Sequence, residues 1–158
     1  YGMARLILEL AQQYPGVRVR IVPGITAACA GAAVLGAPLM HDFAVISLSD
    51  RLTPLEDIWN RVEAAAQADF VICLYNPASK GRPDFFRQAC SRILKYRAED
   101  TVCGLAVNIG REGEEMEVLT LEELKDRRVD MFTTVFVGNS CTRQVGGRMV
   151  TPRGYRNE

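Results

Sequence analysis

The sequence predicts an α/β fold in which a mixed β-sheet is flanked by helices on both faces. Segments with the apolar pattern of strands alternate with segments of helical spacing, an order typical of strand–helix units. Strands at 101–107 and 115–119 are separated only by a short loop with a glycine-containing turn, so they are expected to pair antiparallel. Together these observations favour one folded domain across residues 1–158.

Helices are expected where apolar residues recur at helical spacing between turn signals. They cover 3–13, 26–35, the region after Thr53, 84–96 and a short segment after Thr120. The helix from Thr26 to Leu35 is so rich in Ala and Gly that it should pack closely against a neighbouring element or a ligand. Capping boxes are expected at Thr53 with Glu56 and at Thr120 with Glu123, because such pairs can bond each other's backbone N–H groups.

Strands are expected at 17–22, 43–48, 69–74, 101–107, 115–119 and 133–138. The first alternates polar and apolar residues, whereas 69–74 is an almost continuous apolar run of the kind found in strands buried on both faces. The tail from Arg143 onward is rich in Gly and Arg and is expected to be irregular.

Composition excludes several classes of function. Nineteen Lys+Arg balance nineteen Asp+Glu, so no nucleic-acid or membrane-surface partner is expected. No apolar stretch reaches the roughly 18 residues of a membrane span. The five cysteines are odd in number and contain no CxxC, which indicates a reducing, cytoplasmic compartment. His41 is the only histidine, which excludes a multi-histidine metal site in this chain, and no metal is expected.

Four loops of unusual composition are candidates for a binding site. They are Pro23–Thr26, Ser47–Asp50, Tyr75–Pro77 and Asn108–Arg111. In open α/β sheets, ligands bind outside the carboxyl ends of the strands, where these loops should converge. Neither a Gly-x-Gly-x-x-Gly fingerprint nor a phosphate-binding P-loop is present, which disfavours nucleotide chemistry.

From the residues alone, each of these features has two interpretations. Every loop also fits an ordinary turn, since Pro, Gly and Asn are common turn residues. The pair His41-Asp42 fits either an acid/base pair or a turn. The arginines of the tail fit either a set of carboxylate ligands or a solvated surface; they are Arg143, Arg148 and Arg153.

Several strings of the sequence closely resemble the precorrin-3B C(17)-methyltransferases, a branch of the tetrapyrrole methylase superfamily. The string Val22-Pro23-Gly24-Ile25-Thr26-Ala27 is typical of the superfamily as a whole. More selective for the carbon-17 branch are Leu35-Gly36-Ala37-Pro38-Leu39-Met40-His41-Asp42, Tyr75-Asn76-Pro77 and Thr151-Pro152-Arg153-Gly154-Tyr155. The resemblance covers essentially the whole chain.

The resemblance implies methyl transfer from S-adenosylmethionine to carbon 17 of precorrin-3B, or of its cobalt counterpart, with ring contraction in cobalamin biosynthesis. It also implies a homodimer of two-domain subunits with the class III methyltransferase fold and the cofactor in a cleft between the domains. This chain then corresponds to the C-terminal half, with the N-terminal domain absent, and is expected to fold but to be inactive alone.

By position, the resemblance implies two sets of site residues. The cofactor-binding residues are Tyr1, Gly2, Thr26, Ala27, Leu74, Tyr75, Ala106, Asn108 and Thr133. The candidates that face the macrocycle, from which a catalytic acid or base would come, are His41, Asp42, Ser47 and Asp50.

Two alternatives remain open at this stage. One is a methylase of the same superfamily with another specificity. The other is a cofactor-independent dimerisation or binding module of a cobalamin-pathway protein.

Overall fold

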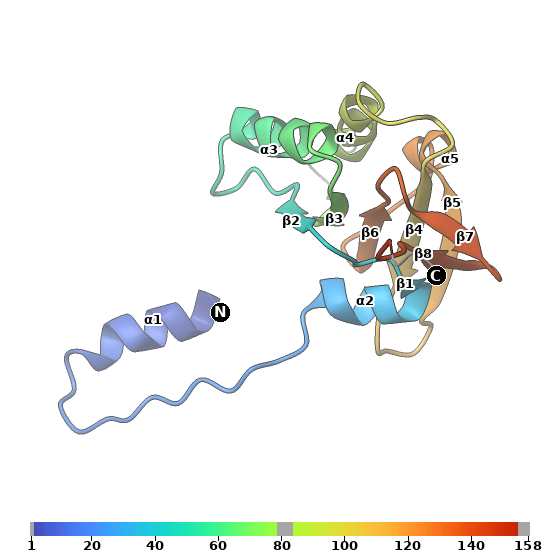
Figure 1. The fold of residues 1–158 in the computed structure, drawn as a ribbon. Helices are drawn as coiled ribbons and strands as arrows, with labels where there is room; N and C mark the ends of the chain where they lie inside the picture. Colours follow the sequence, from blue (N-terminus) through green and yellow to red (C-terminus); the bar gives the residue numbers. More distant parts are fainter. Residues whose placement is uncertain (1, 79–83, 155–158) are drawn as a thin grey trace.

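The computed structural model describes residues 2–78 and 84–154, and a five-stranded mixed sheet lies at its centre (Figure 1). The strand order is β2-β3-β6-β4-β5. The strands are β2 (Phe43–Ser47), β3 (Val71–Tyr75), β4 (Val102–Val107), β5 (Glu115–Thr120) and β6 (Thr133–Val137). The predicted mixed sheet, with its antiparallel β4–β5 hairpin, is confirmed.

The direction of the strands decides where a site can form. β2 and β3 are parallel, and β6 lies antiparallel between β3 and β4. β2, β3 and β4 therefore run in the same direction and end together. We call the side where they end, at Ser47, Tyr75 and Val107, the C-terminal edge of the sheet, and the other side the opposite edge.

Helices cover both faces of the sheet, as predicted. α2 (Ala27–Leu35) lies on one face, and α3 (Leu55–Gln67), α4 (Phe85–Ile93) and α5 (Leu121–Lys125) lie on the other (Figure 1). Successive residues of a strand point to opposite faces. Accordingly, Leu74 joins the core under α3 and α4, whereas Cys73 joins the core under α2.

The small residues of α2 allow it to approach the sheet closely, as the sequence predicted. A Cβ on Gly31 would lie 2.9 Å from Cδ1 of Ile109 and 3.0 Å from the ring of Phe136. On the sheet side, a Cβ on Gly104 would lie 2.7 Å from Cδ1 of Leu35. These glycines therefore set the depth at which α2 sits on β4 and β6.

The C-terminal tail is not irregular, and that prediction is wrong. β7 (Arg143–Val145) and β8 (Arg148–Val150) form a hairpin, and β8 also pairs in parallel with β1 (Gly36–Ala37). Gly146 and Gly147 have φ of +55° and +78°, which two-residue hairpin turns require. The local pattern was too short to show a strand, and the pairing with β1 bridges more than a hundred residues of chain.

The N-terminal segment extends away from the sheet (Figure 1). α1 (Gly2–Ala11) confirms the predicted helix but has no buried residue. The strand predicted at 17–22 is wrong: within the described residues this segment has no strand assignment and leads as an extended connection towards α2. Its alternating pattern suits a strand, but no strand in the described part of the chain pairs with it to supply the ladder of hydrogen bonds that makes one.

Only one of the two predicted capping boxes forms. At α5 the hydroxyl of Thr120 accepts a hydrogen bond from Glu123 N (3.2 Å), and the Glu123 carboxylate accepts one from Thr120 N (2.9 Å). At α3 the N-cap is Pro54, with no side-chain cap bond, so the predicted box at Thr53 is wrong. Pro54 has an extended ψ of 138°, which starts the helix one residue later and moves Thr53 out of the capping position.

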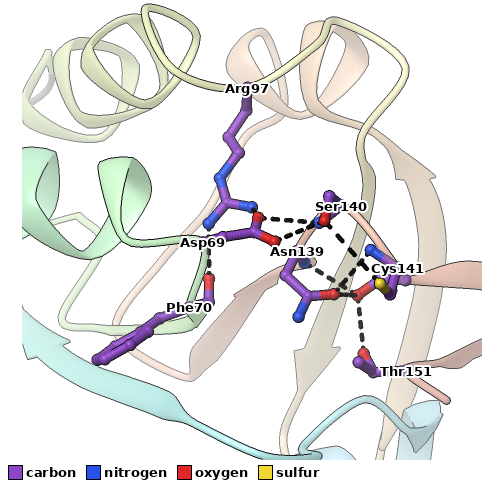
Figure 2. Close-up of polar contacts among 8 residues, drawn as sticks. Asp69, Phe70, Arg97, Asn139, Ser140, Cys141 and Thr151 are labelled. Carbon is purple, nitrogen blue, oxygen red and sulfur yellow. Dashed lines mark hydrogen bonds and ion pairs between the residues drawn. The ribbon is translucent and has the colours of Figure 1, made fainter. Parts of the chain in front are cut away.

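A polar network ties three segments together at the opposite edge of the sheet (Figure 2). The Asp69 carboxylate accepts hydrogen bonds from Ser140 N (3.0 Å) and Ser140 Oγ (2.5 Å) and forms an ion pair with Arg97. Arg97 also donates to the carbonyl of Phe70 at 3.0 Å, and its side chain is only 4% exposed. The network joins the start of β3, the turn after α4 and the loop after β6.

No helix among residues 2–78 and 84–154 is long and apolar enough to cross a membrane. Cys73 and Cys103 are fully buried in the core.

Candidate functional site

The four candidate loops meet at the C-terminal edge. Three of them follow β2, β3 and β4, and the fourth leads into α2. Direct contacts join them: Thr26 bonds Tyr75, and Ser47 bonds Asn76. Ala27 and Asn108 line one small cavity. The sequence therefore placed these loops correctly relative to one another.

Tyr75 connects the end of β3 to the start of α2. Its hydroxyl lies 2.6 Å from Oγ1 of Thr26 and accepts a hydrogen bond of 2.6 Å from the backbone N–H of Ala28. Thr26 is the N-cap residue of α2, yet its own side chain makes no capping bond. The first turn of α2 is thus held by a side chain from the neighbouring strand.

Ser47 and Asn76 form the second contact between loops. Asn76 has φ of +52°, a left-handed conformation that Asn tolerates better than most residues. In that conformation its Nδ2 donates to Oγ of Ser47 at 2.9 Å, and the same oxygen accepts from Ser49 N at 3.2 Å. The backbone is locked across the same gap by Leu48 N, which donates to the carbonyl of Tyr75 at 2.9 Å. The loops after β2 and β3 are therefore fixed before any ligand arrives.

A small cavity of about 130 Å³ lies beside the first turn of α2. Its walls are Ala27, Asn108, Ile109, Arg111, Phe132 and Thr134. Asn108 has φ of +52°, and its Nδ2 donates to the carbonyl of Gly113 at 3.2 Å, which holds the β4–β5 loop in place. The Arg111 guanidinium lies 5.7 Å from the centre of the Phe132 ring, a cation–π arrangement at the rim.

A second cavity, of about 350 Å³, lies on the other side of Thr26. It is lined by Ala4 of α1 and by residues 21–26 of the extended connection, including Ile25 and Thr26. The first turn of α1, which begins at Gly2, therefore faces the loop that leads into α2. Tyr1 lies outside the described residues.

Three of the residues expected to contact the cofactor use their side chains within the protein itself. Leu74 and Ala106 are fully buried in the two halves of the core. The Thr133 hydroxyl donates to Oδ1 of Asp130 at 2.8 Å and accepts from Asp130 N at 3.2 Å, which closes the turn before β6. Only the backbone of these three residues is available to a ligand.

A family model described as Tetrapyrrole (Corrin/Porphyrin) Methylases matches residues 1–125. This chain belongs to the tetrapyrrole methylase family.

The relatives of this tetrapyrrole methylase confirm the resemblance seen in the sequence. It is 48% identical over 156 residues to a probable cobalt-factor III C(17)-methyltransferase of Salmonella typhimurium, covering 98% of this chain and 65% of that protein. It is 45% identical over 163 residues to a cobalt-factor III methyltransferase of Priestia megaterium, covering 30% of that protein. The chain therefore spans about two thirds or less of the length of these relatives.

Solved structures support the same fold. The methyltransferase CobJ superposes with a TM-score of 0.84 at 38% identity, covering 95% of this chain and 64% of that one. A cobalt precorrin-4 methyltransferase, CbiF, superposes with a TM-score of 0.63 at 20% identity, which shows the fold alone.

The structure of this methylase chain separates the four candidates for the macrocycle side. Ser47 ends β2 at the C-terminal edge, and Asp50 follows it in the same loop. His41 and Asp42 precede β2 and lie towards the opposite edge, about 16 Å away along a strand of five residues. There His41 Nε2 bonds the carbonyl of Arg153 at 2.9 Å, and Asp42 accepts a backbone bond from Val71 N. They lie directly before β2, whereas Ser47 and Asp50 stand at its end, so the length of the strand separates the two pairs.

Two features of the site were not predicted from the sequence. The first is the hydrogen bond by which Asn76 fixes Ser47, since Asn76 was named only as a member of its loop. The second is the contact between Phe132 and Arg111. The signal for Asn76 was an Asn directly after a buried strand, where a left-handed residue often ends the strand. No local signal pointed to Phe132, because its partner lies in a different loop.

Proposed function

We propose that this chain is part of an S-adenosylmethionine-dependent methyltransferase that acts on carbon 17 of precorrin-3B or its cobalt counterpart. The proposed reaction accompanies ring contraction in cobalamin biosynthesis. The observation that carries the proposal is the 48% identity to the Salmonella C(17)-methyltransferase over nearly the whole chain. The convergence of four loops at the C-terminal edge supports it independently.

The proposed cofactor site lies at the first turn of α2. Thr26 and Ala27 are exposed there, and small side chains let a ligand approach the backbone. The proposal adds Gly2 and Asn108 on the flanks and the backbone of Leu74, Tyr75, Ala106 and Thr133 along the sheet. Tyr1 belongs to the proposed site by its position in the sequence alone.

The chemistry of the reaction suits such a pocket. When bound, S-adenosylmethionine would supply an electrophilic methyl group on a sulfonium, with the thioether as leaving group. Methyl transfer of this kind depends on alignment, so positioning residues supply much of the catalysis. In the proposed site the contacts Thr26–Tyr75 and Ser47–Asn76 hold the loops in fixed positions, which is what such positioning requires.

Ser47 and Asp50 are the proposed residues on the macrocycle side. Ser47 is the last residue of β2 and Asp50 lies in the loop that follows, next to the end of β3 at Tyr75. His41 and Asp42 stay proposed candidates by their positions in the sequence alone, since in this chain they lie towards the opposite edge of the sheet.

The proposal extends to the whole protein. We propose that the chain is the C-terminal half of a two-domain, homodimeric, cytoplasmic enzyme and is inactive alone. Two observations support this: the chain spans 65% of the Salmonella relative, and α1 leaves its apolar side chains uncovered. Those side chains include Met3, Leu6, Ile7 and Leu10.

Calorimetric titration of S-adenosylhomocysteine tests the cofactor assignment. We expect tight binding to the full-length protein and weak or no binding to residues 1–158. Turnover of precorrin-3B and cobalt-factor III by the full-length protein then identifies the substrate. Absence of binding to the full-length protein overturns the methyltransferase proposal and favours a binding module. Full methyl transfer by the isolated chain overturns only the proposal that this chain is half of the enzyme and is inactive alone.

A further inference from the structure

We propose that Tyr75 is a positioning residue whose hydroxyl caps α2 and orients the hydroxyl of Thr26 towards the bound cofactor. Thr26, and not the Tyr75 hydroxyl, then makes the hydrogen bond to the cofactor. This inference rests on the proposed cofactor site and assigns its two adjacent hydroxyl groups to different roles.

The first step is the direction of the hydrogen bonds at Tyr75. The backbone N–H of Ala28 can only donate, so the phenol oxygen accepts there, at 2.6 Å. The phenol keeps one proton, and the nearest partner is Oγ1 of Thr26, also at 2.6 Å. A phenol O–H is a stronger hydrogen-bond donor than an aliphatic O–H, because the aromatic ring withdraws electron density from the phenol oxygen. The phenol therefore donates to Thr26.

The second step concerns what remains free on Thr26. Its oxygen accepts from Tyr75 and caps no N–H of α2, and within the described residues its hydroxyl has no hydrogen-bond partner other than the Tyr75 oxygen. Thr26 is exposed, and the cavity lined by Ala4 and Ile25 opens beside it. The proton of Thr26 is thus available to an acceptor oxygen or nitrogen of a ligand at this position.

The third step concerns Tyr75 itself. Its ring packs against the core under α2, and both hydrogen-bonding capacities of its hydroxyl are taken up by Thr26 and Ala28. The hydroxyl can reach a ligand only by giving up the cap on α2. A series of hydrogen bonds therefore runs from Ala28 N–H through the Tyr75 hydroxyl to Thr26, and it fixes the direction in which the Thr26 hydroxyl can donate. Polarisation along the series strengthens the hydrogen bond that Thr26 donates.

The test uses the full-length protein and five variants. Tyr75→Phe removes only the hydroxyl and keeps the ring, whereas Thr26→Val removes the threonine hydroxyl at nearly constant shape. The double variant combines them, and Thr26→Ser keeps a hydroxyl. Tyr96→Phe is the matched control, because Tyr96 is a partly exposed tyrosine at the opposite edge. Circular dichroism and urea midpoints first show that each variant is folded.

We expect Tyr75→Phe and Thr26→Val each to weaken S-adenosylhomocysteine binding by about three- to tenfold, as loss of one neutral hydrogen bond does. The double variant should bind no more weakly than Thr26→Val, because Tyr75 acts through Thr26. Thr26→Ser should bind more tightly than Thr26→Val, because it restores the hydroxyl, and Tyr96→Phe should stay within about twofold of wild type. The KM for the cofactor should rise while the KM for the tetrapyrrole stays unchanged, a split that a general loss of structure does not produce.

Three results overturn the inference. Effects of Tyr75→Phe and Thr26→Val that multiply in the double variant show that each hydroxyl contacts the ligand separately. Unchanged binding by Tyr75→Phe, in a wild type that binds, shows that the hydroxyl positions nothing. Absence of binding by wild type overturns the proposed function and this inference together, which distinguishes that failure from the first two.

Discussion

Asp69→Asn is the substitution whose effect the structure predicts most sharply. Asp69 has φ of +60°, and Asn is among the few side chains that adopt such a backbone readily. The amide can still accept from Arg97 and bond Ser140, so the shape of the network in Figure 2 is retained. What is lost is the negative charge that faces a guanidinium whose side chain is 4% exposed.

The magnitude lies between two limits. Breaking a fully buried ion pair costs about 3–5 kcal/mol, because it leaves an uncompensated buried charge. An exposed pair contributes only about 0.2–1 kcal/mol. Arg97 is buried, and its Nε has no hydrogen-bond partner among the described residues, but the Asp69 side chain is 46% exposed and therefore screened by water. We expect a loss of about 2 kcal/mol in the free energy of unfolding, equivalent to about 4–8 °C in Tm.

Urea denaturation followed by circular dichroism measures this loss. The matched control is Asp126→Asn, which breaks the Arg87–Asp126 pair of 3.1 Å whose side chains are 65% and 61% exposed. The control should cost less than about 0.5 kcal/mol. The reasoning is refuted if Asp69→Asn also stays within about 0.5 kcal/mol of wild type, since burial of Arg97 would then carry no electrostatic cost.

Three further predictions follow from packing, capping and ionisation. Gly104→Ala should destabilise the protein by about 1–3 kcal/mol in urea denaturation, because its Cβ would lie 2.7 Å from the buried Leu35. Thr120→Ala should cost about 1 kcal/mol by the same measurement, because it removes the capping box of α5. Burial raises the pKa of the Cys73 and Cys90 thiols to about 12, whereas an unfolded thiol ionises near 8.5. Because the unfolded state loses these protons first, the free energy of unfolding should fall as the pH rises from about 9 towards 12.

Each of these predictions has a control within the chain. Gly24→Ala should leave stability nearly unchanged, since no atom lies within 4 Å of the added Cβ, and an equal loss at both glycines contradicts the packing argument. Thr53→Ala should be nearly neutral, because Thr53 caps no helix, and a loss as large as that of Thr120→Ala would restore the capping box expected from the sequence. In the native protein a thiol reagent should label Cys29 and Cys141, which are exposed, and spare the buried cysteines, and rapid labelling of all five would show that burial does not protect them.

Much of the fold could be predicted because its signals are local. The apolar run of residues 69–74 overlaps β3 at four of its five residues, and the Thr120–Glu123 spacing marked the start of α5. The small residues of 26–35 predicted the close approach of α2 to the sheet, which Gly31 and Gly104 confirm. Each of these features depends on residues within one or two turns of chain, so the sequence carries the information directly.

The predictions that failed depended on partners far along the chain. The segment 17–22 has the pattern of a strand, but no described strand pairs with it, whereas Arg148–Val150 became a strand through pairing with Gly36–Ala37. Thr53 matched a capping box, but the extended backbone of Pro54 moved the start of α3. Pairing and helix register are decided by the free energy of the whole arrangement, which a short window of sequence does not contain.

For the site, the sequence by itself determined the family, the four loops and their common edge. These follow from motif residues and from the rule that parallel strands end together. Only the tertiary structure decided that Tyr75 caps α2, that Asn76 fixes Ser47, and that His41 bonds the carbonyl of Arg153. The physical reason is that a hydrogen bond forms only when its two atoms are positioned to within a few tenths of an ångström. The residues joined here are 29 to 112 positions apart in the sequence, and sequence spacing does not encode where their atoms lie in space.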